Sequence, residues 1–261
     1  MTPRAIRIHC TFCGDDDVGR AREDVVPLWL ARKLAFVAET NHPGTAPSYV
    51  NYGYENLAEF QKDEPSSSSP SGAIPAAYKL PEVCIECNGG WMSRLEQAAR
   101  LLIVGLMEGR SKRLTPCDQL VLSTWMTKTC LTYDASRDPR YIPEEIGSRQ
   151  FFEQGYPLVA SHVVIGFDSD HHPEGSFAHS RMLVNATHEL PRDKTAVLIG
   201  FQFDQLIFQA CINIVEGTDD DVITGLGIPL TSARYEQIWP TKSKFDWPSE
   251  DAKIRRHPER W

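Results

Sequence analysis

The chain has 261 residues, of which 41% are hydrophobic and 24% are charged, an ordinary composition for a globular protein. Its net charge of −8 counts against extensive non-specific binding of nucleic acid, although it leaves room for a local basic patch. No apolar run approaches the roughly 20 residues that cross a bilayer, and the N-terminus lacks the apolar core of a signal peptide, so we expect a cytoplasmic protein with no membrane partner.

Four of the seven cysteines form two Cys-x-x-Cys pairs, Cys10 with Cys13 and Cys84 with Cys87. Four thiolates close a tetrahedral structural zinc site, and in cytosolic chains such pairs hold metal more often than they form disulfides. We therefore interpret these cysteines as Zn²⁺ ligands, with a disulfide or redox pair as the alternative. The other three are interpreted as buried small apolar residues: Cys117, Cys130 and Cys211.

Residues 1–38 contain the first cysteine pair, preceded by a short strand expected within residues 1–9. After Pro27 the apolar spacing predicts a short helix. Residues 39–76 are rich in turn and linker chemistry, and we interpret them as an insertion whose serine-rich part, 66–72, is mobile. A strand near 77–80 is expected to return the chain to Cys84.

Residues 77–110 hold the second cysteine pair and then a helix that ends near Gly109. Ser93 and Glu96 have the spacing of a capping box at the start of this helix. Residues 111–156 are predicted to be helical, because Thr115-Pro116 caps a second helix that ends near Tyr133. A third short helix is expected over 143–154. The first two helices should pack as a hairpin against the metal site.

Residues 157–261 are predicted to form a β-rich domain, because the apolar period shifts towards two. Strands are expected at 159–167, 177–185, 196–203 and 206–215, with Asp204-Gln205 turning one hairpin. The aromatic, proline-rich tail at 238–248 is expected to strap the surface. The predicted fold class is therefore α+β, with a mostly antiparallel C-terminal sheet.

With these residues laid out, the chain resembles the HNH, or His-Me finger, endonucleases. Their pattern is Cys-x-x-Cys, then an acidic residue and His before x-x-Pro, then Cys-x-x-Cys-Asn and a helix. The matching run here is Glu23-Asp24-Val25-Val26-Pro27 between the cysteine pairs, with Asn88 directly after Cys87. Trp29-Leu30 and the run 91–96 match bacterial HNH proteins, and the likeness covers mainly residues 8–36 and 80–107.

The resemblance implies a zinc-stabilised treble-clef ββα-metal finger that hydrolyses phosphodiester bonds of nucleic acid, in the first place DNA. It implies a catalytic Mg²⁺ or Mn²⁺ that stabilises charge on the scissile phosphate, with Glu23 and Asn88 as its ligands. In the family a histidine on the first strand is the general base, a role worth roughly 10²–10⁴ in rate.

This chain departs from the family at one position, because Asp24 stands where the histidine is expected. Aspartate side chains have ordinary pKa values near 4 and are weak bases at neutral pH, so impaired cleavage is expected. Three interpretations stay open. Asp24 serves as ligand or base, a histidine elsewhere (His9 or His42) replaces it, or the finger is only a scaffold.

The same residues also have plainer interpretations. Asn88 suits a knuckle or a cap, the acidic pair suits a solvated turn, and Trp29 and Trp91 suit core anchors better than base stacking. Lys112 and Arg113 are candidate phosphate contacts, as is the basic run at 253–256, although short basic runs are usually solvated surface. The alternative function is a non-catalytic zinc finger that binds DNA or a protein partner. A third possible function lies in the β domain, with the zinc site purely structural. The sequence of that domain contains no motif that indicates a particular reaction.

Overall fold

The computed structural model describes residues 6–41, 49–53, 67–70, 78–159, 161–168, 177–185, 195–214, 235–248 and 253–254. Helices and strands are mixed along the chain and most strand pairs are antiparallel, so the α+β class predicted from the sequence is confirmed. In the part of the chain that is described, no helix is long and apolar enough to cross a membrane.

The two cysteine pairs lie at the ends of a small antiparallel sheet. Its strands are β1 (Arg7–Ile8), β2 (Val18–Asp24) and β5 (Lys79–Cys84), in the order β1-β2-β5. Strand β2 leads into helix α1 (Leu28–Asn41), directly after Pro27 as predicted. Strand β5 leads into a run of helical turns formed by α3 (Ile85–Cys87), η2 (Asn88–Met92) and α4 (Ser93–Met107). We call β1, β2, β5, α3, η2 and α4 the finger.

The capping box predicted at Ser93 is wrong, because the chain is already helical before this residue. Met92 precedes Ser93 with helical φ/ψ, and no side chain caps α4. The Ser93 hydroxyl instead accepts a hydrogen bond from Gln97, 3.2 Å away. Although the run is kinked at Gly90, the Ser93 N–H already donates to the carbonyls of Asn88 and Gly90, so Ser93 lies inside the helical run and does not cap it.

Helix α5 (Pro116–Ala135) does begin with a capping box, at Thr115 and Asp118. Strand β6 (Lys112–Leu114) lies in the connection between α4 and α5, which pack against one another. Every residue from Leu122 to Asp134 is buried. A helix that is buried all round must be covered on all sides, and α5 contacts both β5 of the finger and the large sheet.

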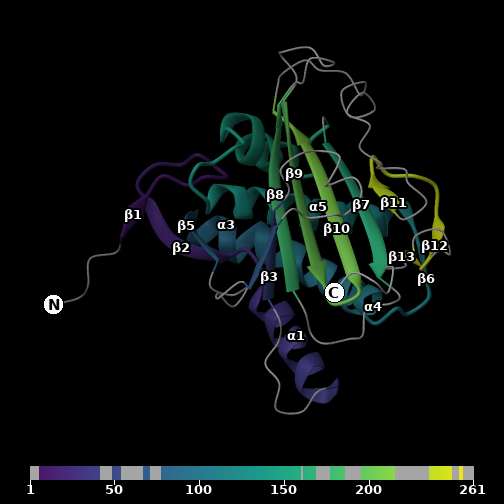
Figure 1. The fold of residues 1–261 in the computed structure, drawn as a ribbon. Coiled ribbons are helices and arrows are strands. Elements are labelled where there is room, and N and C mark those ends of the chain that lie inside the picture. The colour runs from purple at the N-terminus through teal and green to yellow at the C-terminus, as the bar shows by residue number, and fades with distance from the viewer. Residues whose placement is uncertain are drawn as a thin grey trace.

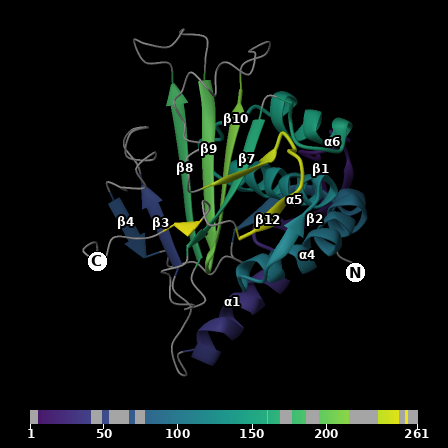
Figure 2. The ribbon, with the colours of Figure 1, turned by 90° about the vertical axis from the view of Figure 1, so that its right-hand side faces the viewer.

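The large sheet has the strand order β11-β7-β10-β9-β8-β3-β4, and α5 crosses one of its faces (Figures 1 and 2). Its four central strands confirm the predicted ones and are mutually antiparallel, with a tight turn at Asp204-Gln205. They are β7 (Ser161–Asp168), β8 (Phe177–Asn185), β9 (Thr195–Phe203) and β10 (Leu206–Asn213).

The segment 39–76, interpreted from sequence as an insertion or linker, adds strands to this sheet. Strand β3 (Tyr49–Gly53) pairs in parallel with β8, and β4 (Ser67–Pro70) pairs with β3 at the edge. The serine-rich residues 67–70 are therefore extended strand rather than linker, because backbone pairing with a sheet edge needs no apolar side chains. The predicted domain boundaries stay a prediction.

The C-terminal tail also pairs with other parts of the chain instead of only covering the surface. Strands β11 (Glu236–Trp239) and β13 (Lys253–Ile254) both pair with β7, and β12 (Phe245–Trp247) pairs with β6. Between α5 and β7, the third predicted helix is confirmed as η3 (Glu145–Arg149) and α6 (Gln150–Gln154).

One hydrophobic core joins the finger, α5 and the large sheet. On the sheet side, Trp125 of α5 lies 6.0 Å from Phe203 and 5.9 Å from Phe208, measured between ring centroids. On the finger side, Val83, Met92 and Leu106 belong to the same core. Because α5 is the layer between them, side chains on its two faces meet different partners.

The two serine/threonine positions give a matched stability test. Thr115→Ala removes the hydroxyl that accepts from the Asp118 N–H at 3.2 Å, so we expect a loss of about 1 kcal/mol in the free energy of unfolding. Ser93→Ala removes no cap and is expected to change it by less than about 0.5 kcal/mol. Chemical denaturation measures both, and an equal loss in the two variants would contradict the observed helix start.

Candidate metal centre and the adjoining polar cluster

The four cysteines of the two pairs meet at one point. Their Sγ atoms all lie within 4.8 Å of one another, and Cys13 Sγ is 3.8 Å from Cys84 Sγ. A tetrahedral ion with Zn–S bonds of about 2.3 Å separates its sulfurs by about 3.8 Å. A disulfide needs about 2.05 Å, and all four cysteines are free. The cluster could therefore hold a metal ion such as zinc.

Backbone N–H groups hold two of the four sulfurs. The Cys87 N–H donates to Cys84 Sγ over 3.3 Å, and the Cys84 N–H donates to Cys10 Sγ over 3.4 Å. In the first knuckle, the chain reverses at Gly14, whose φ of +75° favours glycine. A Cβ at this glycine would also collide with the Arg149 guanidinium.

The thiols of the cluster have opposed pKa shifts. A hydrogen bond from the Cys87 thiol, opposed by burial, lowers the pKa of Cys10 to about 4, whereas burial raises the pKa of Cys13 to about 12. Burial likewise raises the pKa of Cys84, and the hydrogen bond to Cys10 raises that of Cys87. Four adjacent sulfurs cannot all carry charge on their own, and a bound cation removes this conflict because it binds the thiolate form.

The finger brings Glu23 and Asn88 together, as the family resemblance implies. Asn88 follows Cys87, and its Nδ2 donates to Glu23 Oε2 over 3.0 Å and to the Arg22 carbonyl over 3.0 Å. Glu23 lies on β2, which a register shift between Ala21 and Glu23 interrupts, and only 5% of its surface is exposed. The two predicted ligands are therefore adjacent in the structure.

A residue that the sequence analysis did not assign to the site is the nearest partner of Glu23. Lys128 of α5 is fully buried, and its Nζ donates to Glu23 Oε1 over 2.5 Å and to Glu96 Oε1 over 2.9 Å. We call Glu23, Asn88, Glu96 and Lys128 the Lys128 cluster. The available signal was a lysine on a helix whose nearby Trp125, Met126 and Leu131 favour burial, since lysine is rarely buried without a carboxylate partner.

Burial and charge act against one another within the cluster. Burial raises the pKa of Glu23, and the Lys128 ammonium opposes this rise. For Lys128, burial lowers the pKa, but the carboxylates of Glu23 and Glu96 outweigh it and raise the pKa overall. Glu96 was predicted to cap α4, but it instead accepts a hydrogen bond from the Lys128 ammonium, as Glu23 does.

The other predicted catalytic position, Asp24, lies outside this cluster. It pairs with Lys79 of the neighbouring strand, with Nζ 2.6 Å from Oδ1, and its side chain is 25% exposed. His9, one candidate replacement base, is held by Asp16 at 2.7 Å and Glu144 at 3.0 Å. His42, the other candidate, lies outside the described residues.

The predicted phosphate contacts Lys112 and Arg113 already have acidic partners. Lys112 pairs with Asp118 at 3.1 Å, and Arg113 pairs with Asp246 at 2.9 Å on strand β12. Figure 1 places β6 and β12 on the opposite side of the molecule from β1 and β2. Their role in nucleic-acid binding stays a prediction. In the run 253–256, only the backbone of 253–254 is described.

Two basic residues that the sequence analysis did not single out lie on β2, and one of them, Arg22, contacts Asn88 through its backbone carbonyl. Arg20 and Arg22 line a cavity of about 390 Å³ on the outer side of the finger, together with Ile6 and Ile85. Arg22 is exposed, and its carbonyl is the one that Asn88 contacts. Both arginines line this one cavity, although the register of β2 shifts between Ala21 and Glu23.

The tryptophans of the resemblance are partly buried and pack against the hydrophobic core, and Trp91 also lines a cavity. The Arg100 guanidinium lies over the Trp29 ring, 5.6 Å from its centroid, and Trp91 meets Phe12 edge to face with ring centroids 5.5 Å apart.

Of the three single cysteines, Cys130 and Cys211 are buried as predicted. Cys117 is exposed, because it lies on the first turn of α5, before that helix becomes buried.

Comparison with known proteins adds no relative. No protein-family model matches the chain, and neither the curated proteins nor the solved structures contain a match.

Zinc content tests the four-cysteine cluster. We expect the purified protein to carry one Zn²⁺ per chain, and Cys87→Ser to lose most of this zinc and unfold at lower temperature. Cys117→Ser, an exposed cysteine outside the cluster, is the matched control and should keep both. Elemental analysis with thermal denaturation measures the two properties, and a Cys87→Ser protein with full zinc would overturn the assignment.

Removal of Lys128 tests its part in stability. Lys128→Met leaves Glu23 buried without its cation, so we expect a loss of about 3–5 kcal/mol in the free energy of unfolding. Adding Glu23→Gln should restore much of the loss, because the uncompensated charge is then gone. Lys79→Met, which breaks the more exposed pair with Asp24, should cost about 1 kcal/mol or less. Denaturant titration measures all three, and no recovery in the double variant would refute a charge-based cause.

Proposed function

We propose that this chain is a metal-dependent HNH-like endonuclease of a zinc-stabilised treble-clef finger, with weakened hydrolysis of nucleic-acid phosphodiester bonds. The observation that carries the proposal is the contact between Glu23 and Asn88 beside the four-cysteine cluster. These residues are 65 apart in sequence, and both were expected as ligands from the resemblance. DNA is the proposed substrate.

The residues present fit a divalent ion in part. Glu23 Oε2 and the Asn88 amide nitrogen are 3.0 Å apart, close to the separation of about 3 Å between neighbouring ligands of an octahedral Mg²⁺. A half-turn of the Asn88 amide would present its oxygen, the atom that such an ion prefers. Mg²⁺ or Mn²⁺ held there would stabilise negative charge on a scissile phosphate.

The other residues of the finger would then have distinct tasks. Lys128 holds Oε1 of Glu23 and leaves Oε2 facing Asn88. Hydrogen-bond partners of this kind orient carboxylates that bind metals. Arg20 and Arg22 offer positive charge to a phosphate backbone next to Asn88. Asp24, paired with Lys79, would accept a proton from water only weakly.

A second function is favoured by the Lys128 ammonium itself. It already neutralises Glu23, and no histidine among the described residues lies in contact with Glu23 or Asn88. In this alternative the finger is a zinc-stabilised module that binds DNA or a protein partner and does not cleave. Arg20 and Arg22 would then be contacts for binding alone.

Cleavage of plasmid and single-stranded DNA by the zinc-loaded protein with Mg²⁺ or Mn²⁺ tests the proposal. We expect slow cleavage that Asn88→Ala abolishes and that Asp24→His raises by about 10²–10⁴, because histidine is the better base at neutral pH. Asp17→Asn, a charge-removing change at an exposed position of the same module, should leave the rate unchanged.

Metal binding is measured beside cleavage, by calorimetry with Mn²⁺. Asn88→Ala should weaken it, and Asp17→Asn should not. The nuclease proposal would be refuted if neither the natural sequence nor Asp24→His cleaves DNA and if Mn²⁺ binding does not depend on Asn88. DNA binding that is indifferent to Mg²⁺ would then favour the non-catalytic module.

A further inference from the structure

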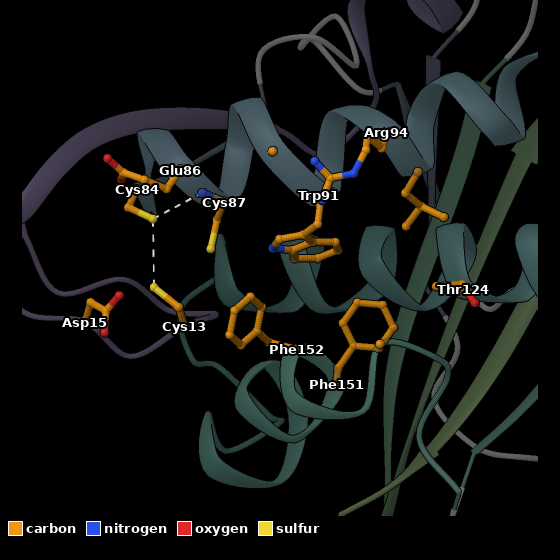
Figure 3. A pocket seen from close by; sticks show the side chains of 13 residues that line it. Cys13, Asp15, Cys84, Glu86, Cys87, Trp91, Arg94, Thr124, Phe151 and Phe152 are labelled. Carbon is orange, nitrogen blue, oxygen red and sulfur yellow. Dashed lines mark hydrogen bonds between the residues drawn. The ribbon is translucent and has the colours of Figure 1, made fainter.

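A second cavity lies between the four-cysteine cluster and α6. It has a volume of about 630 Å³, within the range of roughly 300–1,000 Å³ for small-molecule sites. Its walls come from the finger, from α5 and from the α6 region (Figure 3). Cys13, Cys84 and Cys87 of the four-cysteine cluster form one end of this cavity, and its aromatic rings and Arg94 have no role in the proposed hydrolysis.

Aromatic rings form the middle of this cavity. Trp91 lies 5.7 Å from Phe151 and 6.1 Å from Phe152 between ring centroids, and Figure 3 shows the three rings together. Phe151 is buried, whereas 37% of Phe152 is exposed at the edge. A rigid aromatic wall with one exposed ring offers a stacking surface to a planar ligand.

Two glycines add open space beside the rings, because they have no side chain. Gly90 and Gly155 line the cavity, and a Cβ built on either would meet no atom within 4 Å. The φ of +73° at Gly155 explains that glycine, whereas Gly90 has negative φ. Gly90 therefore leaves room in the cavity where a larger residue would place its Cβ.

The charged groups of the cavity are separated by sign. Asp15 and Glu86 lie at the cysteine end, and Arg94 lies away from them, beyond Trp91 (Figure 3). Arg94 is exposed and has no ion pair with any residue that the structure describes. A ligand that matches this order has an anion at one end, a planar aromatic body, and hydrogen-bond donors at the other end.

We propose that this cavity binds a nucleotide, with the base against Trp91 and Phe152, the phosphate at Arg94, and an exocyclic amino group facing Asp15 and Glu86. Carboxylates accept hydrogen bonds from base amino groups, as Asp and Glu do from cytosine N4. The nucleotide is either free or part of an unpaired strand, since both present this chemistry. The inference does not depend on hydrolysis and would stand if the finger had no catalytic activity.

Calorimetry with the zinc-loaded full chain tests the proposal. CMP and UMP form the central pair, because they differ where cytosine carries an amino group and uracil a carbonyl oxygen. We expect CMP to bind more tightly, by about tenfold, and Glu86→Gln to reduce the difference. Equal binding of CMP and UMP, or no binding of CMP, AMP and GMP, would overturn the assignment.

Two variants separate stacking from charge. Phe152→Ala should weaken CMP and cytidine alike, by about 5- to 100-fold, whereas Phe36→Ala, an exposed phenylalanine on α1, should weaken neither. Arg94→Ala should weaken CMP by about tenfold and leave cytidine unchanged, with Arg100→Ala as its control. Loss of CMP binding in the two controls would contradict the site.

Three further probes identify what the cavity prefers. Inorganic phosphate alone should not displace CMP, because the rings supply most of the contact. Tetramethylammonium binding that displaces CMP would overturn the proposal in favour of a cation site on the aromatic faces. A cytosine-containing single-stranded oligonucleotide that competes with CMP supports the strand as source, and one that does not compete supports a free nucleotide.

Asn88→Ala distinguishes this inference from the proposed nuclease. The variant removes a metal ligand of the proposed reaction and does not line the cavity, so CMP binding should remain. Loss of CMP binding in Asn88→Ala, with zinc retained, would contradict a site separate from the finger's metal pair.

Discussion

The arrangement of the finger against the rest of the molecule depends on one buried ammonium. Lys128 comes from α5, Glu23 from β2 and Glu96 from α4, so a single group joins three elements at 2.5 Å and 2.9 Å. Burying the charges of Lys128 and Glu23 is costly unless each is paired, and the half-buried Glu96 adds a second carboxylate to the ammonium. Here Asn88 also satisfies the second oxygen of Glu23. The cluster therefore specifies how α5 is seated under the finger.

The same contacts allow both proposed functions, and they differ only in what Glu23 Oε2 faces. If Asn88 turns its oxygen towards a divalent ion, Lys128 is the group that orients a ligand. If the amide stays a donor, Lys128 is the cation that completes a structural pair. The four-cysteine cluster serves either function, because it holds β5 and the first knuckle together and so sets the position of Asn88.

The two cavities beside the finger offer different chemistry. The cavity at β2 has Arg20 and Arg22, which suits a phosphate backbone. The cavity near α6 has aromatic rings between a cation and two carboxylates, which suits a base with its phosphate. The overall charge of −8 is compatible with both, since each surface needs only a few local arginines.

The sequence by itself determined the features that depend on neighbours along the chain. The cysteine spacing, the Thr115 cap, the helix after Pro27 and the alternating strands are short-range patterns, and each has a local physical cause. Asn88 was also identified by its position directly after Cys87. Tertiary structure decided the contacts between distant residues. Lys128 meets Glu23 across 105 positions, and β3 joins β8 although its flanks resemble linker. Packing selects the partner of a buried charge or of a sheet edge, and no local period records that choice.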